Sequence, residues 1–118
     1  MNEQRPAQRL IQMSVPKRTV RLAPDAQRDF DDILLYTRRT WGAGQRARYR
    51  AAIERALDTL SRFPEAGRPR DDRFPGCRSL QVEQHVIYFY QSGPDEIEVI
   101  RILHQRQDAG AAVRDPRG

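Results

Sequence analysis

The chain has 118 residues, a net charge of +5 and a single cysteine, Cys77. A chain of this length forms one domain with one core. A lone cysteine excludes an internal disulfide and a cysteine-based metal site, so we expect a reducing cytoplasm. The sequence contains no run of about 18 apolar residues, so no membrane span is predicted. Because Lys17 is the only lysine, the basic charge is almost wholly arginine, which binds carboxylate and phosphate alike.

The two ends of the chain differ in composition from the middle. Residues 1–16 are polar, contain Pro6 and Pro16 and show no apolar period, which predicts a disordered leader. After His104 the sequence turns polar again. We therefore expect a folded domain over residues 17–108 and a flexible tail over residues 109–118.

Apolar residues recur at helical spacing over two successive stretches. The first begins at Pro24, which suits a first helical turn, and ends at Gly42. The second follows a short break and ends before Pro64. Two helices joined this tightly form an antiparallel hairpin. Before them, residues 17–23 alternate as a short strand that would join a sheet.

The pattern of the second half of the chain predicts strands. A loop rich in proline and glycine covers residues 65–76, and alternating or apolar runs follow at 80–83, 85–90 and 97–103. The run 85–90 is apolar on both faces, which predicts a central strand. We expect an α+β fold in which the helical hairpin packs on one face of a small antiparallel sheet. One hairpin cannot cover both faces, so an apolar stripe should stay exposed for a partner.

Arg101 is the one basic residue within the last strand. By simple alternation it shares a face with Ile97, Val99 and Leu103. A charge in that position needs a partner, water or a ligand. A contact with a ligand and a structural ion pair with an acidic residue are both open.

Few residues have the chemistry of an active site. The sequence lacks a His-Glu-x-x-His helix, a phosphate-binding glycine loop and a Gly-x-Ser-x-Gly turn, and we expect no metal and no cofactor. RNA can be cut without metal by an acid, a base and cations. Residues of these types are Arg68, Arg78, Arg101, His85 and His104, of which Arg78, Arg101 and His104 are the nuclease candidates. The structural alternatives are a sheet-edge charge for Arg78 and a satisfied sheet residue for His85.

The helices carry charges of both signs. Asp29, Asp31 and Asp32 are interpreted as a solvated face that complements the helix dipole, and Trp41 as a core anchor or a side chain that fills the turn between the helices. A basic run is interpreted either as a solvated helix end or as a contact for phosphate or an acidic partner. It comprises Arg38, Arg39, Arg46, Arg48 and Arg50.

Several short motifs follow one another in a specific order between Val20 and Asp108. In the order and spacing of these motifs, the chain resembles the ParE branch of the RelE/ParE toxin superfamily of bacterial toxin-antitoxin systems. The motifs are Leu22-Ala23-Pro24, Asp29-Phe30-Asp31-Asp32-Ile33 with Tyr36, Trp41-Gly42 with Gln45-Ala47-Tyr49, Phe63-Pro64-Glu65-Ala66-Gly67-Arg68, Gly76-Cys77-Arg78-Ser79-Leu80, His85-Val86-Ile87-Tyr88-Phe89-Tyr90 and Ile100-Arg101-Ile102-Leu103-His104-Gln105-Arg106-Gln107-Asp108.

The resemblance implies a RelE-like strand, helical hairpin and three-stranded sheet, and a toxin held silent by a cognate antitoxin. The antitoxin would be ParD-like or another DNA-binding protein, in a toxin-antitoxin hetero-oligomer. ParE-like members are associated with inhibiting DNA gyrase, growth arrest and plasmid stabilisation, whereas RelE-like members cut mRNA on the ribosome. From Leu80 to Leu103 the strands carry Arg101 as their only cation and no lysine, which favours the gyrase branch, with nucleic acid contacted only indirectly. A non-toxic antitoxin-binding module is a further alternative.

Two sets of contact residues follow from these expectations. The target-binding candidates lie in the loop 64–76 and from the last strand onward: Arg68, Arg70, Arg73, Arg101, His104 and Arg106. The antitoxin-binding candidates are Arg38, Arg39, Trp41, Arg78, Tyr88 and Tyr90.

Overall fold

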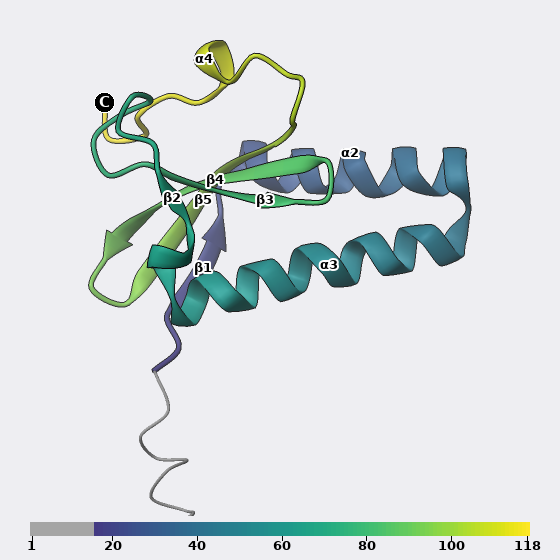
Figure 1. The fold of residues 1–118 in the computed structure, drawn as a ribbon, viewed down its shortest axis with the longest axis horizontal. Coiled ribbons are helices and arrows are strands. Elements are labelled where there is room, and N and C mark those ends of the chain that lie inside the picture. The colour runs from purple at the N-terminus through teal and green to yellow at the C-terminus, as the bar shows by residue number, and fades with distance from the viewer. Residues whose placement is uncertain (1–15) are drawn as a thin grey trace, which may run out of the picture.

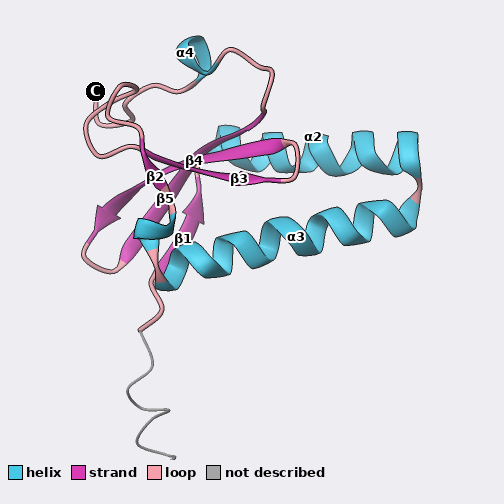
Figure 2. Cartoon of the chain, viewed as in Figure 1, coloured by secondary structure: helices cyan, strands magenta, loops and turns pink. Residues whose placement is uncertain are grey.

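The fold is described by a computed structural model that covers residues 16–118 (Figure 1). The predicted α+β fold, with one strand, a helical hairpin and a three-stranded meander, is confirmed (Figure 2). Of the leader expected over residues 1–16, residues 1–15 lie outside the described residues. The elements in chain order are β1 (Thr19–Leu22), α2 (Pro24–Trp41), α3 (Ala43–Arg62), η1 (Pro64–Ala66), β2 (Arg68–Pro69), β3 (Arg78–Val82), β4 (His85–Gly93), β5 (Glu96–His104) and α4 (Ala109–Ala112).

Proline and glycine set the ends of the two long helices. Pro24 begins α2, where its missing N–H leaves no bond unmade. Gly42 ends α2 with φ 96°, a conformation that suits glycine, and its N–H donates to the carbonyl of Arg38 at 2.9 Å. Pro64 follows α3 directly and begins η1. Within residues 16–118, no helix is both long enough and apolar enough to cross a bilayer.

The strands form one sheet in the order β1-β5-β4-β3-β2. β3, β4 and β5 pair antiparallel as neighbours along the chain, and β1 pairs parallel with β5. The strand predicted to be central, β4, lies in the middle of this order, which confirms the prediction. Its apolar side chains are buried on both faces, Ile87 and Phe89 on one and Tyr88 and Tyr90 on the other.

One face of the sheet packs against α2 and α3. Ile53 and Leu60 of α3 are fully buried, and they share a cluster with Ile87 and Phe89 of β4. Phe30 of α2 belongs to the same cluster. The helical stripes seen in the sequence therefore form the larger core of the domain.

The other face is also covered, so the prediction of an exposed apolar stripe there is wrong. Ala109 and Val113 are buried in a second cluster with Tyr88, Tyr90 and Leu103. α4 and the residues after it lie on the opposite side of the sheet from α3 (Figure 1). The expected flexible tail thus packs on the sheet, because its few small apolar side chains complete the cover that one hairpin cannot supply.

Arg117 attaches the end of this C-terminal segment to the domain. Its guanidinium carbon lies 5.4 Å from the ring centroid of Phe74 and 5.2 Å from that of Tyr90. Arg117 also donates to the Pro75 carbonyl at 2.5 Å and pairs with Asp115 at 2.9 Å. Polar and cation–π contacts therefore help to hold this segment on the domain, in addition to the small apolar area that it buries.

A β-bulge at Ile100 shifts the alternation of β5. Ile97 and Val99, before the bulge, face the hairpin, whereas Leu103, after it, belongs to the cluster on the other face. The predicted common face of Arg101 with these three residues is therefore wrong. One extra residue moves every later side chain to the opposite face.

Arg101 forms an ion pair with Asp29 of α2. Its Nε and Nη2 donate to the two carboxylate oxygens at 2.8 and 2.9 Å, and Asp29 also accepts the Ile102 backbone N–H at 2.9 Å. β1 ends at Leu22, opposite Val99, so this part of β5 has no strand on its β1 side, and there the Asp29 carboxylate supplies the acceptor for the Ile102 N–H. The structural alternative for Arg101 is confirmed, and the interpretation of Asp29 as part of a solvated face is wrong.

Candidate functional site

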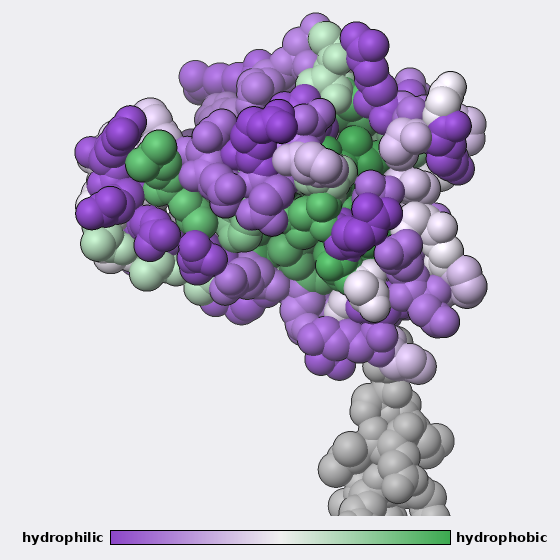
Figure 3. Space-filling model, turned by 180° about the vertical axis from the view of Figure 1, so that it is seen from behind, coloured by the Kyte–Doolittle hydropathy of each residue, from purple (hydrophilic) through white to green (hydrophobic). Residues whose placement is uncertain are grey.

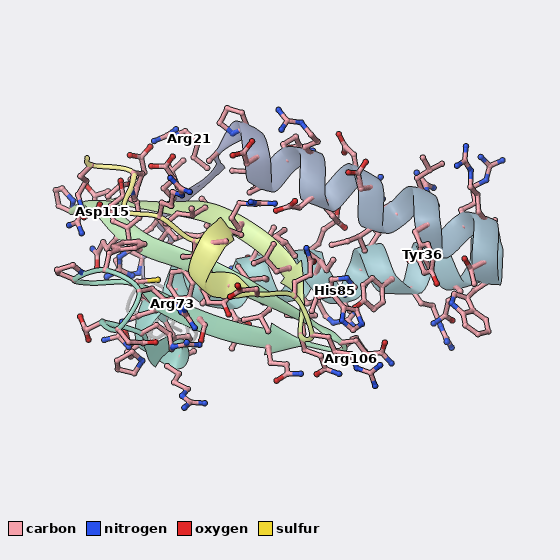
Figure 4. All side chains as sticks on the ribbon, turned by 90° about the horizontal axis from the view of Figure 1, so that it is seen from above. Arg21, Tyr36, Arg73, His85, Arg106 and Asp115 are labelled. Carbon is pink, nitrogen blue, oxygen red and sulfur yellow. The ribbon has the colours of Figure 1, made fainter. Side chains whose placement is uncertain are left out.

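An open cavity of about 600 Å³ lies where the hairpin extends past the end of the sheet. α2 and α3 form one side, and the β3–β4 turn with the adjoining ends of β4 and β5 forms the other. Figure 4 shows Tyr36, His85 and Arg106 at this end of the molecule, whereas Asp115 lies toward the other end. The cavity is lined by Tyr36, Thr37, Trp41, Gln45, Tyr49, Glu83, Gln84, His85 and His104.

Two aromatic side chains of α2 stand largely in solvent beside this cavity. Tyr36 is 65% exposed and Trp41 is 69% exposed. Trp41 was expected to anchor the core, but the last turn of α2 extends beyond the sheet, which leaves it nothing to pack on (Figure 1). That expectation is wrong, and an exposed tryptophan is a feature of contact surfaces.

Tyr49 of α3 contacts the ring of His85 at the start of β4. The Tyr49 hydroxyl and His85 Nδ1 are hydrogen-bonded, and the ring centroids are 5.4 Å apart. The Tyr49 oxygen accepts the Gln84 backbone N–H at 3.4 Å, and burial raises the pKa of Tyr49. The hydroxyl therefore keeps its proton, and it donates that proton to Nδ1 when the neutral His85 ring carries its own proton on Nε2.

His85 also faces His104 across the β4–β5 pair. The two residues are directly opposite in the register, and their ring centroids are 5.3 Å apart at an angle of 82°. Burial and, next, the nearby His104 lower the pKa of His85 from 6.5 to about 4. His104 Nδ1 accepts the Arg106 backbone N–H at 3.1 Å. His85 is therefore neutral near pH 7, and the accepting Nδ1 of His104 places the proton of its neutral ring on Nε2.

The hairpin end beside the cavity is strongly basic. Residues 33–53 contain five arginines and neither aspartate nor glutamate. Arg50 pairs with Glu54 at 3.5 Å, and Arg48 donates to the Gln45 amide oxygen at 2.5 Å. Among residues 16–118, no carboxylate lies within ion-pair distance of the other three, which are Arg38, Arg39 and Arg46.

Three of the target-binding candidates lie between η1 and β3. Arg70 is held by a bidentate contact with Asp72 at 3.0 and 3.1 Å, which raises the pKa of Arg70, and it lies 5.8 Å from the Tyr88 ring centroid. Arg73 also lies near Asp72, at 3.5 Å. Arg68 is exposed on β2 at the edge of the sheet. Only Arg68 therefore presents its side chain fully to solvent.

The other target-binding candidates are placed elsewhere. Arg106 is exposed beside His104 at the cavity, whereas Arg101 is held by Asp29 on α2. Arg73 lies well away from Arg106 in the same view (Figure 4). The six candidates do not form one continuous surface.

The residues proposed for RNA cleavage are not brought together. Arg78 lies opposite Phe89 in the sheet, whereas His104 lies opposite His85 at the other end of β4. Arg78 Nη1 donates to the Gly67 carbonyl at 2.6 Å, and Arg101 is engaged by Asp29. Both cations are therefore used in structural contacts.

The antitoxin-binding candidates divide into exposed and covered residues. Arg38, Arg39 and Trp41 are exposed on the last turn of α2. Tyr88 and Tyr90 are buried under the C-terminal segment, and the Tyr90 hydroxyl donates to Glu98 at 3.1 Å. The expectation that these two tyrosines are open to a partner is wrong. In the view from behind, apolar residues appear only in patches bordered by hydrophilic side chains (Figure 3).

The cavity contains residues that the sequence candidates did not include. Tyr36, Tyr49 and Gln84 were not among them, and His85 was interpreted as a satisfied sheet residue. Tyr49 and His85 are 36 positions apart, so no local pattern links them. Within residues 16–118, no group of three or more histidine, cysteine or acidic side chains is placed to hold a metal ion.

The amino-acid sequence matches one described protein family. Residues 20–109 match the family described as ParE toxin of type II toxin-antitoxin system, parDE. Toxin ParE1 of Mycobacterium tuberculosis is 34% identical over 87 residues, covering 74% of this chain and 89% of the relative. Toxin ParE1 of Caulobacter vibrioides is 34% identical over 91 residues, covering 77% and 93%. Toxin ParE of Escherichia coli is 31% identical over 94 residues, covering 80% and 91%.

Two solved structures share the fold. One is the chromosomal ParDE toxin-antitoxin system from P. aeruginosa, with a TM-score of 0.64 and 22% identity over 75% of this chain and 96% of that chain. The other is the toxin-antitoxin complex RelBE2 from Mycobacterium tuberculosis, with a TM-score of 0.56 and 22% identity over 75% and 99%. At this identity the likeness supports the fold, and the predicted RelE-like architecture is confirmed.

Proposed function

Because the chain belongs to the ParE toxin family of type II toxin-antitoxin systems, we propose that it inhibits DNA gyrase and is neutralised by a cognate antitoxin. Inhibition of gyrase is what the resemblance to the ParE branch implies. The site of action is the cytoplasm, where gyrase works. Growth arrest follows when the antitoxin is absent, and on a plasmid that arrest would favour cells that keep the pair.

The positions of Arg78 and Arg101 favour a toxin that acts by binding over a toxin that acts as a nuclease. A metal-free ribonuclease needs cations against the reacting phosphate. Arg78 donates to the Gly67 carbonyl and Arg101 to Asp29, and neither lies beside His104. An inhibitor of gyrase requires no hydrolytic site in this chain, because gyrase itself breaks and rejoins the DNA.

The hairpin end supports an acidic antitoxin segment as the neutralising partner. Five arginines with no intervening carboxylate, next to the exposed Tyr36 and Trp41, complement an acidic chain with apolar anchors. The P. aeruginosa and M. tuberculosis structures of the same fold are a toxin-antitoxin system and a toxin-antitoxin complex by name. A hetero-oligomer with the antitoxin is therefore the proposed resting form.

Purified chain and gyrase test the target. We expect supercoiling to fall and cleaved DNA to accumulate as the chain is added. Arg68→Ala and Arg106→Ala should weaken the effect, whereas Arg55→Ala, an exposed arginine midway along α3, should not. A folded chain that neither slows supercoiling nor traps cleaved DNA would contradict the gyrase proposal.

The protein encoded next to this chain tests neutralisation. Co-purification of the two should give a stable complex on size exclusion, and the complex should leave gyrase active. Arg38→Ala with Arg39→Ala should weaken that complex. If the neighbouring protein binds and the free chain still allows growth, the chain is a non-toxic binding module.

A ribosome-dependent ribonuclease is the second candidate. The observation that favours it is the pairing of His85 with His104 beside Tyr49, which gathers titratable groups at one cavity. In a translating extract, this function predicts specific mRNA cuts that disappear with His104→Ala. Intact mRNA in the presence of active gyrase inhibition would reject it.

A further inference from the structure

The cavity lies beside the basic end of the hairpin, so two kinds of chemistry are close together. Arg38, Arg39 and Arg46 supply positive charge at this end, with Arg38 and Arg46 lining a groove between α2 and α3 that also contains Asp31. Tyr36 and Trp41 present aromatic rings that are 65% and 69% exposed, and both line the cavity. Arginines around exposed aromatic rings are the usual make-up of surfaces that bind unpaired nucleotides.

The cavity lining adds groups that recognise base edges. Gln45 and Gln84 carry amides, which offer both a donor and an acceptor. His104 accepts a hydrogen bond at Nδ1 and so carries the ring proton of its neutral form on Nε2, whereas Nδ1 of His85 is hydrogen-bonded to the Tyr49 hydroxyl. Glu83 contributes an acceptor. At about 600 Å³ the cavity is large enough for a base and part of its sugar.

We propose that this surface binds a single-stranded segment of nucleic acid, with an unstacked base in the cavity and phosphates on the arginines of the hairpin end. The rings of Tyr36 and Trp41 stack on bases, and Arg38, Arg39 and Arg46 contact the backbone. This activity is separate from gyrase binding, but it uses residues that are also proposed to contact the antitoxin, so the antitoxin and nucleic acid would compete for this surface. It gives the chain a direct nucleic-acid contact, where the sequence predicted only an indirect one.

The charge inside the cavity favours nucleic acid over an acidic peptide as its occupant. Glu83 lines the cavity and would repel a carboxylate placed there, whereas it accepts a hydrogen bond from the amino group of cytosine, adenine or guanine. The arginines attract both kinds of partner equally. The lining, rather than the net charge, therefore distinguishes them.

Trp41 provides a direct signal, because it is the only tryptophan in the chain. Titration of the full chain with a mixed-sequence single-stranded DNA oligonucleotide should quench its fluorescence as a base stacks. Affinity should fall with salt, and log Kd should rise by about 2 per decade of salt concentration for three neutralised phosphates. The duplex of the same sequence should bind more weakly, because its bases are not free to enter the cavity.

Matched variants separate stacking from charge, with a labelled oligonucleotide followed by anisotropy. Trp41→Ala should weaken binding about tenfold or more, whereas Phe63→Ala, which removes an aromatic ring 44% exposed at the far end of α3, should leave it unchanged. Arg38→Gln with Arg39→Gln should weaken binding and flatten the salt slope, whereas Arg55→Gln should not. Tyr36→Ala gives a second stacking variant if Trp41→Ala does not fold.

Three results would overturn the proposal. One is no quenching and no anisotropy change with either single-stranded DNA or single-stranded RNA. Another is unchanged affinity in both aromatic variants, which would mean that only charge attracts the oligonucleotide. The last is binding of the duplex as tightly as the single strand, which would mean that no unstacked base enters the cavity.

Discussion

One face of the sheet packs against α2 and α3, of 18 and 20 residues, whereas the other packs against the four-residue α4, the residues around it and the loop before β3. The helical side buries large side chains such as Ile53 and Leu60. On the other side, the C-terminal segment contributes only Ala109, Ala112 and Val113, with Arg117 stacked at its end. Both faces of the sheet are thus covered, but the helical side does so with much more apolar contact than the C-terminal segment.

This difference indicates how stability is distributed. Long helices with several buried side chains open only with the whole domain, whereas a short segment held by a few contacts can open locally. We therefore expect global unfolding to depend on the helical face. The C-terminal segment should separate from Tyr88 and Tyr90 at a lower free energy.

The largest expected effect is on the helical face. Ile53→Ala should lower the free energy of unfolding by about 2 to 5 kcal/mol, because Ile53 is fully buried against the sheet. Chemical denaturation measures this loss, with Arg55→Ala on the exposed side of α3 as the control that stays within about 0.5 kcal/mol. A near-zero loss for Ile53→Ala would mean that this face is not the main core.

The contact between α2 and β5 should have the next largest effect. Arg101→Ala should cost about 2 to 3 kcal/mol of stability, because it leaves the half-buried Asp29 carboxylate without its main partner. Asp29→Ala should cost a similar amount, and the double variant should cost less than the sum. If Arg101→Ala abolished toxicity without changing stability, Arg101 would be a target contact instead.

His85 makes the helical side sensitive to acid. Its folded pKa of about 4 lies below the usual 6.5, so the unfolded chain binds the proton more readily between these values. Stability contributed by neutral His85 is therefore present above about pH 6.5 and is lost as the pH falls toward 4. We expect a loss of about 1 to 2 kcal/mol, less than the full shift implies because the ring is partly exposed to solvent.

The difference between the wild type and His85→Gln isolates this effect from the titration of carboxylates. Denaturation curves for both should differ more at pH 7 than at pH 4.5. If the free energy of unfolding of the two proteins had the same pH dependence, protonation of His85 would not destabilise the fold. The contact of Tyr49 with the His85 ring would then not be as described.

The smallest expected effect is on the other face. Val113→Ala should lower the free energy of unfolding by only about 1 kcal/mol, although Val113 is 3% exposed, because its neighbours can move with the short segment. Hydrogen exchange should show faster opening of residues 109–113 and unchanged protection in α3. A loss as large as that of Ile53→Ala would remove the distinction between the faces.

Local patterns in the sequence were sufficient for the main elements. The stripe from Pro24 to Gly42, the stop at Pro64 and the apolar run of β4 each involve residues near one another in the chain, so the periods predict the hairpin and the central strand. The cover over the second face was missed because Ala109 and Val113 stand in a polar tail. Two small side chains give no detectable period.

The candidate site was predicted less completely than the fold. The exposure of Trp41 depends on how far α2 extends past the sheet, which its helical spacing does not reveal. Arg101 was placed on the wrong face because the bulge at Ile100 leaves no signal in the alternation. The contact of Tyr49 with His85 joins a helix to a strand, and a single sequence carries no information on such pairs.

The parallel pairing of β1 with β5 has a consequence for the timing of synthesis. Thr19 near the start of the domain is opposite Glu96, and Leu22 is opposite Val99. A growing chain releases its N-terminal part first, at about 5 to 20 residues per second. β1 therefore waits without a partner until β5 has been made, and a product cut short before Glu96 lacks both the neighbour of β4 and the partner of β1. The sheet can therefore be completed only after β5 has been synthesised.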